Sequence, residues 1–274
     1  MQIPNLQSPA IQPASVPADD PRMMQVGPAG NQRRIAYIRR AGKPDGKPGM
    51  VWLPGLMSDM RSTKAGALED WAGRQGRSLL RFDYSGHGLS SGAFTQGCIS
   101  QWLEEALAVI RAHSEGPQIL AGSSMGGWLA LLAARALAQA GETARLHAMV
   151  LIAPAVDFTV ELLRQWQAPG GAKEVDAAGN WLRPSDYGAP MPFSRLLLED
   201  GASHQLHGTL IRSHCRVHIL QGMQDAVVPW QTATRLTEHL ASDPVVLTLI
   251  RDGDHRLSRP QDIALLLETI AAMG

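Results

Sequence analysis

Residues 118–140 read QILAGSSMGGWLALLAARALAQA and carry the strongest signal for the fold of this chain. Four residues of an apolar, strand-like run lead into Gly-Ser-Ser-Met-Gly, and a long apolar segment of helical length follows. In a nucleophile elbow, a buried strand turns sharply into a helix and leaves a serine at the apex with a strained backbone. Gly122 and Gly126 suit that turn, because strand and helix approach too closely there for a Cβ atom. The pattern predicts Ser124 as an exposed nucleophile, and the alternative is an ordinary Gly-Ser turn.

The segments around this elbow alternate between strand and helix patterns. Strand followed by helix, repeated along a chain, is typical of a mostly parallel sheet with helices on both faces, which is an α/β fold. We expect strands at 34–39, 50–53, 79–83, 118–121, 148–153, 216–220 and 245–250, and helices at 64–75, 101–113, 127–140 and 262–273.

Two parts of the chain do not follow the alternation. Residues 1–22 carry five prolines and lack both a basic start and a continuous apolar segment, so they do not form a signal peptide. We expect an extended, poorly ordered arm there, with partner binding through it as an alternative role. Glycines and prolines interrupt residues 157–213, which we interpret as a helical cap inserted into a core formed by 23–156 and 214–274.

The composition limits the kind of partner. Lysine plus arginine (25) balances aspartate plus glutamate (25), so no net charge favours a nucleic acid or an anionic membrane. No segment has the roughly 18 consecutive apolar residues of a membrane-spanning helix. Cys98 and Cys215 lie in unrelated segments without disulfide or metal-site spacing. We expect a soluble, cytoplasmic protein that acts on a small molecule of low charge, with oligomeric state left open.

A serine hydroxyl becomes a useful nucleophile only beside a base that a carboxylate orients. In this fold the acid follows the strand after the insertion and the histidine follows the last strand. Asp225 and His255 occupy those two places. The two oxyanion-binding N–H groups should come from Met125, the residue after the nucleophile, and from Leu56 in the early Pro-Gly turn. Met57 is an alternative donor, and a plain turn is the alternative for the Pro-Gly pair.

Other polar residues compete for these roles. Asp157 follows the strand before the insertion, a place from which some related enzymes take their acid. Asp254 adjoins the histidine, and we expect it to shape the turn. His87 belongs to a tight turn and should be structural. His204 and His207 have a spacing that permits metal binding but lack a third ligand, so we expect no metal site.

Several motifs give the chain a resemblance to known proteins. Over about Arg34 to Met273 it resembles the α/β-hydrolases, and within that superfamily it is most similar to the mitochondrial palmitoyl-protein thioesterase / mycophenolic acid acyl-glucuronide esterase family. The closer match rests on Leu-Pro-Gly at 53–55 with Ser58 and Thr-Lys-Ala at 63–65, Arg-Phe-Asp-Tyr-Ser-Gly at 81–86, Gly-Ser-Ser-Met-Gly-Gly-Trp at 122–128, Gly-Met-Gln-Asp at 222–225 with Val-Pro-Trp at 228–230, and Asp-His-Arg at 254–256.

The resemblance implies Ser124 as nucleophile, Asp225 as acid and His255 as base. Superfamily members commonly carry His-Gly where this chain has Pro-Gly at 54–55. The closer relative also has proline there. The arm and the insertion match the closer relative less clearly. Because the insertion is expected to line the substrate pocket, the resemblance says least about the identity of the substrate.

Together these features predict a serine hydrolase of carboxylic esters or acyl thioesters, including the thioester of an acylated protein, that needs no cofactor or metal. Alternatives with the same three residues are a carboxylesterase, a monoacylglycerol lipase or an acyl-glucuronide esterase. A serine at the elbow argues against dehalogenases and epoxide hydrolases that use an aspartate nucleophile. From another class, the fold could serve as a non-catalytic ligand-binding protein, or the arm as an interaction module.

Overall fold

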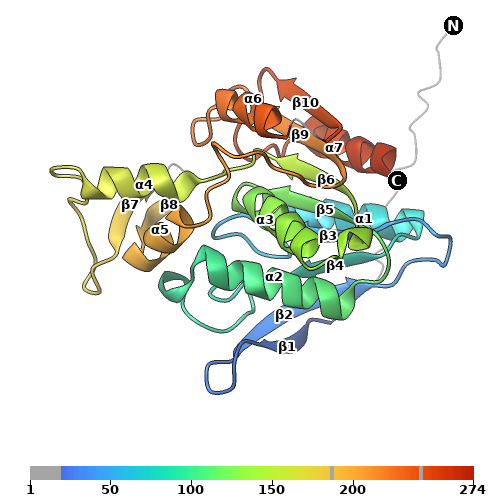
Figure 1. Cartoon of the computed structure of the whole chain (residues 1–274), viewed down its shortest axis with the longest axis horizontal. Coiled ribbons are helices and arrows are strands. Elements are labelled where there is room, and N and C mark those ends of the chain that lie inside the picture. The colour runs from blue at the N-terminus through green and yellow to red at the C-terminus, as the bar shows by residue number, and fades with distance from the viewer. Residues whose placement is uncertain (1–19, 186–187, 241–242) are drawn as a thin grey trace, which may run out of the picture.

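The computed structural model describes residues 20–185, 188–240 and 243–274, so most of the predicted N-terminal arm, 1–22, lies outside the described residues (Figure 1). An eight-stranded sheet lies at the centre, in the order β1-β2-β4-β3-β5-β6-β9-β10. Its strands are β1 (Arg22–Val26), β2 (Arg33–Arg40), β3 (Gly49–Leu53), β4 (Leu79–Phe82), β5 (Gln118–Ser123), β6 (Leu146–Ile152), β9 (Arg216–Gly222) and β10 (Val245–Ile250).

The sheet is mostly parallel, as predicted. Strands β4, β3, β5, β6, β9 and β10 pair in parallel, and β1 and β2 are antiparallel additions at one edge. Every residue of β3, β4 and β5 is buried, which explains their mostly apolar sequences. The α/β-hydrolase fold class is therefore confirmed.

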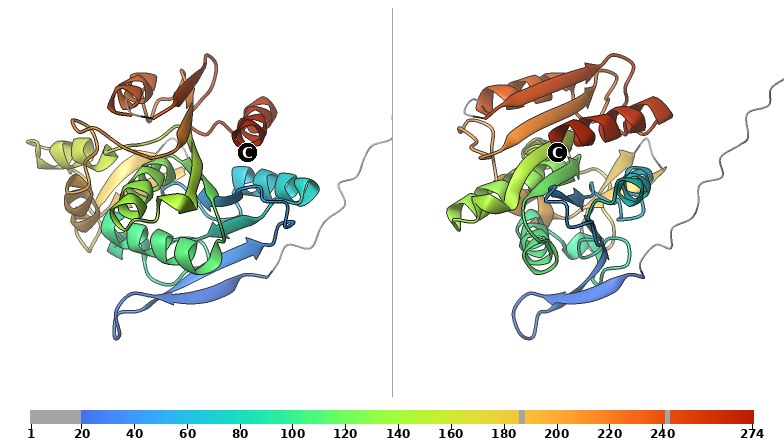
Figure 2. Two further views of the ribbon diagram at one scale, coloured as in Figure 1. Left: turned by 45° about the vertical axis from the view of Figure 1, so that its right-hand side comes forward. Right: turned by 90° about the vertical axis from the view of Figure 1, so that its right-hand side faces the viewer.

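Helices cover both faces of this sheet (Figure 2). Helices α1 (Thr63–Gln75) and α7 (Pro260–Met273) lie on one face, and α2 (Ile99–His113), α3 (Met125–Gln139) and α6 (Trp230–His239) lie on the other. Because successive strand residues point to opposite faces, Trp52 of β3 packs in the cluster with α1 and α7, whereas Leu53 packs in the larger cluster with α2 and α3. Two short 3₁₀ helices, η1 (Phe94–Gln96) and η2 (Thr143–Arg145), lie in connecting loops.

The segment after β6 forms a separate group of elements beyond the carboxyl ends of the parallel strands, at the left of Figure 1. It contains α4 (Phe158–Gln167), an antiparallel pair β7 (Trp181–Ser185) and β8 (Gly188–Phe193), and α5 (Arg195–Ala202). The insertion was predicted to be helical, and the structure adds this β-hairpin to its helices. Trp181 of β7 packs against Trp166 and Phe193, so the group has its own aromatic contacts.

Candidate active site

Ser124 occupies a strained turn between β5 and α3. Its backbone has φ 54° and ψ −119°, outside the regions that most residues adopt. A Cβ atom on Gly122 would lie 2.3 Å from the carbonyl oxygen of Gly126, and one on Gly126 would lie 2.0 Å from the carbonyl oxygen of Leu53. Both glycines are therefore required by close backbone contacts. The Ser124 N–H donates to the Ile152 carbonyl at 2.8 Å, which holds the apex against β6.

The structure brings the three predicted polar side chains together from three different loops. The Nε2 atom of His255 lies 3.0 Å from the Oγ atom of Ser124, and the Nδ1 atom of His255 lies 2.8 Å from Oδ2 of Asp225. The loops follow β5, β9 and β10, whose carboxyl ends lie at one edge of the parallel sheet. The result is a continuous hydrogen-bonded chain from hydroxyl to imidazole to carboxylate.

Asp225 is held firmly in this chain. Its Oδ1 atom accepts hydrogen bonds from the backbone N–H groups of Val227 and Val228, each at 2.8 Å. Its Oδ2 atom accepts from Nε2 of Gln221 at 3.0 Å as well as from His255. Burial by itself raises the pKa of Asp225, but the hydrogen bonds and charge of His255, together with the two N–H groups, lower the pKa below its ordinary value overall. The carboxyl group is therefore ionised at neutral pH.

The turn after β3 packs against the serine. A Cβ atom on Gly55 would lie 3.3 Å from the Cβ atom of Ser124, so this position also requires a close approach. Leu56 is partly buried against the main core cluster, and Met125 is fully buried at the start of α3. Both residues predicted to supply oxyanion donors thus lie in segments that adjoin the serine.

Two charged residues at the end of β4 anchor the same turn. Oδ1 of Asp83 accepts the Met60 N–H at 2.7 Å, and Nη1 of Arg81 donates to the Met60 carbonyl at 2.9 Å. Oδ2 of Asp83 accepts the Leu89 N–H at 2.8 Å. Burial raises the pKa of Asp83, against the effect of these N–H groups. The Arg-Phe-Asp-Tyr-Ser-Gly motif therefore serves to fix loops beside the serine.

Comparison with known proteins places this geometry in a family. A family model described as serine aminopeptidase, S33, matches residues 50–195. The bovine protein named "Palmitoyl-protein thioesterase ABHD10, mitochondrial" is 36% identical over 238 residues, which are 86% of this chain and 75% of the bovine protein. The solved structure of α/β-hydrolase domain-containing protein 10 from mouse is 33% identical with a TM-score of 0.78, over 92% of this chain and 98% of that one. The chain belongs to the ABHD10 family of α/β-hydrolases. The similarity predicted from the motifs is thereby confirmed.

A second solved structure, from a bacterium, is more similar in sequence to this chain than the mouse protein is. A putative hydrolase from Agrobacterium vitis S4 is 46% identical with a TM-score of 0.87, over 94% of this chain and 99% of that one. The match therefore covers nearly the whole of both chains.

The prediction of a cytoplasmic location is wrong. The bovine, mouse, rat and human members of the family are all named as mitochondrial. The prediction rested on the two cysteines and on the sequence of the arm. Cys98 and Cys215 are indeed free thiols, but unpaired thiols do not distinguish one reducing compartment from another. In the described part of the chain, no helix is long and apolar enough to cross a membrane.

In this chain, the two other candidate acids, Asp157 and Asp254, bind residues outside the Ser124–His255–Asp225 chain. Asp157 accepts the backbone N–H groups of Leu206 and His207, so it ties the end of the insertion to its beginning. Asp254 is exposed, and its Oδ1 atom accepts the Leu257 N–H at 2.9 Å. Asp254 therefore shapes the turn after β10, as predicted.

The three other candidate histidines pack against, or lie within hydrogen-bond distance of, residues outside the candidate site. His87 is buried among Tyr84, Phe94 and Trp102, and burial lowers its pKa, which favours the neutral ring. His204 lies 2.7 Å from Oγ of Ser100, and His207 packs against the ring of His239. Among the described residues, no group of three or more histidine, cysteine, aspartate or glutamate side chains is arranged to hold a metal ion.

Two polar residues beside the site were not predicted from the sequence. Gln221 is fully buried in β9, where it donates to Asp225 and to the carbonyl groups of Gly222 and Val228. A glutamine directly after the apolar pair Ile219 and Leu220 is the signal that could have identified it, because a buried amide needs hydrogen-bond partners. Lys64 of α1 is the second, and its contacts lie 192 and 194 residues away in the chain.

Proposed function

We propose that the protein hydrolyses carboxylic esters and acyl thioesters through an acyl-serine intermediate. The observation that carries the proposal is the continuous chain Ser124–His255–Asp225, with contacts of 3.0 and 2.8 Å. Serine, histidine and aspartate in this arrangement form the catalytic triad of acyl-transfer enzymes. The relatives named as palmitoyl-protein thioesterases support the thioester of an acylated protein as one substrate class.

In the first half-reaction, Oγ of Ser124 attacks the acyl carbonyl carbon as its proton passes to Nε2 of His255. Asp225 keeps the other ring nitrogen, Nδ1, protonated and stabilises the imidazolium that forms. The tetrahedral intermediate then collapses, and the leaving thiolate or alkoxide takes the proton from His255. The acyl group remains on the serine as an ester.

In the second half-reaction, water gives a proton to His255 as it attacks the acyl-serine carbon. The serine oxygen leaves and recovers that proton, and the carboxylic acid departs. The backbone N–H groups of Met125 and Leu56 serve as the oxyanion hole in both halves. Each such donor contributes about 3 kcal/mol to the transition state.

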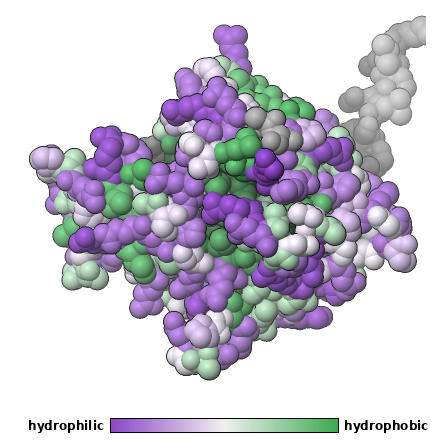
Figure 3. All heavy atoms as spheres, in the orientation of Figure 1, coloured by the Kyte–Doolittle hydropathy of each residue, from purple (hydrophilic) through white to green (hydrophobic). Residues whose placement is uncertain are grey.

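The insertion, 157–213, serves as the cap over the serine in this proposal. Phe158, at the start of α4, packs edge-on against Trp128 of α3, one helical turn beyond Ser124, with ring centroids 5.6 Å apart. Val175, Leu196 and Leu210 are exposed on the insertion, and Figure 3 shows apolar and hydrophilic residues intermixed there, at the left. Apolar side chains next to the elbow suit an acyl group as the part of the substrate that the cap covers.

The test is hydrolysis of p-nitrophenyl esters and of acyl thioesters over a series of chain lengths, with wild type compared with Ser124→Ala. Wild type should hydrolyse both classes, and the variant should lose at least about 10³-fold in kcat. A fluorophosphonate probe should label the wild type at one serine and leave the variant unlabelled. Equal activity of the two proteins, or no activity of wild type on any ester or thioester, would refute the proposal in favour of a ligand-binding role.

A further inference from the structure

Lys64 is a buried cation with an unusual position. It is the second residue of α1, directly after the loop that contains Leu56, and only 9% of its surface is exposed. Lysine is almost never buried to this degree unless its ammonium group has partners. The partners of Lys64 are the carbonyl oxygen of Arg256, at 2.5 Å from Nζ, and Oγ of Ser258, at 3.2 Å.

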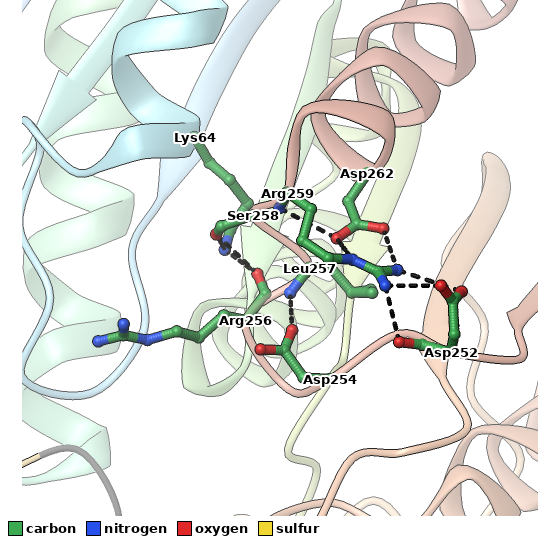
Figure 4. Close-up of polar contacts among 8 residues, drawn as sticks. All are labelled: Lys64, Asp252, Asp254, Arg256, Leu257, Ser258, Arg259 and Asp262. Atoms are coloured by element: carbon green, nitrogen blue, oxygen red, sulfur yellow. Dashed lines mark hydrogen bonds and ion pairs between the residues drawn. The ribbon is translucent and has the colours of Figure 1, made fainter.

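These partners belong to the loop that carries His255. The carbonyl of Arg256 is the next one along the chain after His255, and Ser258 also donates to that carbonyl, at 3.0 Å. Figure 4 shows Lys64 reaching from α1 into the turn formed by Arg256, Leu257 and Ser258. The ammonium group thereby links the first turn of α1, which follows the loop after β3, to the loop after β10, which holds the imidazole.

Ion pairs and a hydrogen bond within residues 252–262 hold the rest of the loop that carries His255. Arg259 bridges Asp252 at 2.7 Å and Asp262 at 2.9 Å, and Asp254 accepts the Leu257 N–H (Figure 4). Leu257 is buried in spite of a φ of 43°, a value that L-residues rarely adopt. The loop is therefore strained near its tip, and Lys64 binds it directly beside that strained residue.

We infer that Lys64 is a positioning residue for the reaction: by holding the Arg256 carbonyl, it keeps the His255 ring in line with Ser124. The inference rests on the proposed function, because it concerns the base of that reaction. Lys64 does not touch the hydroxyl or the imidazole. Its effect should therefore appear in the chemical step and leave substrate binding largely unchanged.

The charge of Lys64 gives the inference a specific pH signature. Burial lowers the pKa of Lys64 to about 8, with Asp254 and Asp262 acting to raise the pKa and Arg256 acting to lower it further. Near pH 7 the group is an ammonium ion, and hydrogen bonds from a charged donor are about twice as strong as neutral ones. Above pH 8 the neutral amine holds the carbonyl less tightly, so kcat should fall through this range.

The experiment measures kcat and KM for a p-nitrophenyl ester from pH 6 to 10. It compares wild type with Lys64→Met, which preserves length and apolar contacts, and with Lys47→Met, which removes an exposed lysine just before β3, at the amino ends of the parallel strands. At pH 7, Lys64→Met should lower kcat about 10-fold and change KM by less than about three-fold. Wild type should show a fall in kcat with an apparent pKa near 8, and Lys64→Met should lack that step. Lys47→Met should match wild type.

A Lys64→Met protein that folds and has wild-type kcat overturns the inference, as does a loss confined to KM. If Lys64→Met does not fold, the wild-type profile decides, and a kcat that stays flat from pH 7 to 10 overturns the inference. The Ser124→Ala variant separates the two proposals: if wild type is no more active than Ser124→Ala, the proposed function fails and the inference with it. If wild type is active and Lys64→Met has the same kcat, the inference fails and the proposed function stands.

Discussion

Replacing Asp225 with asparagine tests the assignment of the acid most directly, because it changes one oxygen to an NH₂ group in a carboxylate whose two oxygens both accept hydrogen bonds. Oδ1 of Asp225 faces two backbone N–H groups, those of Val227 and Val228, which cannot turn away. The amide oxygen of the asparagine must therefore take the Oδ1 position. The NH₂ group is then placed at Oδ2, where it faces Nδ1 of His255 and Nε2 of Gln221.

This placement decides the histidine tautomer. An NH₂ group beside Nδ1 requires that nitrogen to accept a hydrogen bond, so the ring proton moves to Nε2. A protonated Nε2 cannot take the proton of Ser124, and the negative charge that stabilises the imidazolium is lost as well. The equivalent substitution in a serine protease lowers kcat about 10⁴-fold, which is about 5 kcal/mol of transition-state stabilisation. We expect a loss of that size for Asp225→Asn.

The assay is steady-state hydrolysis of a p-nitrophenyl ester at pH 7.5, with the melting temperature of each variant measured alongside. Asp157→Asn is the matched control, because Asp157 is also a buried aspartate that accepts backbone N–H groups, but its partners are Leu206 and His207. Asp157→Asn should keep kcat within about three-fold of wild type. A loss of less than ten-fold in folded Asp225→Asn, or a larger loss in Asp157→Asn, would show that our account of the acid is wrong.

Two further predictions concern stability. The folded-state pKa of Lys64, about 8, lies below its ordinary value of 10.5, so the unfolded chain binds more protons between these two pH values. The free energy of unfolding of wild type, relative to that of Lys64→Met, should therefore rise from pH 8 to 10.5 by at most about 3 kcal/mol. Urea unfolding midpoints that change by the same amount with pH in both proteins would contradict this. Gly126→Ala would place a Cβ atom 2.0 Å from the Leu53 carbonyl oxygen, so we expect a loss of about 3 kcal/mol or more. A wild-type melting temperature for that variant would rule out the close backbone contact.

The core of the fold was predictable because its signals are local. Strands β3, β5 and β6 are buried on both faces, and each contains an apolar run, at 50–53, 119–121 and 148–152. Strand β1 gives no such signal, because it is an edge strand paired on one side only, with three of its five residues exposed and one buried. Helix α6 was missed for a similar reason, since it buries only Ala233 and Leu236.

The hairpin of the insertion was missed because prolines argue against strands. Residues 157–213 contain Pro184, Pro190 and Pro192, which we read as breaks. In the structure Pro184 lies in β7, and Pro190 and Pro192 lie in β8. A two-stranded sheet consists of two edge strands, and a proline on an edge strand can direct its missing N–H away from the partner. The rule against proline holds for central strands, and the sequence alone does not show which strands are central.

Within the candidate site, the three side chains that the structure brings together could be identified from the sequence, and the residues that support them could not. Each reacting residue directly follows a strand, so chain order alone identifies Asp225 and His255. The contact of Lys64 with Arg256 spans 192 residues, and nothing local to either residue indicates it. Gln221 lies between these cases, since its position at the end of a predicted strand is visible in the sequence but its hydrogen-bond partner is not. Supporting residues of this kind depend on how loops meet in three dimensions.

The distribution of backbone strain connects these supports to the chemistry. Six non-glycine residues in the described part of the chain have positive φ values: Met57, Ser124, Ala153, Asp157, His214 and Leu257. All but His214 lie within seven residues of the carboxyl ends of β3, β5, β6 or β10, at the edge of the sheet where the reacting groups meet. Residues in such conformations cost about 1–3 kcal/mol each, so this edge holds strain comparable to the net stability of a domain.

That strain persists only because surrounding contacts hold it. The Ile152 carbonyl binds the Ser124 N–H, Asp83 binds the loop after β3, and Lys64 binds the loop after β10 beside Leu257. Loss of any one anchor lets its loop relax toward ordinary backbone angles, and a relaxed loop no longer places its reacting group at hydrogen-bond distance. Substitutions of the anchors should therefore lower activity more than their effect on global stability alone implies. The fully buried strands, which carry no such strain, supply the rigid frame against which the anchors act.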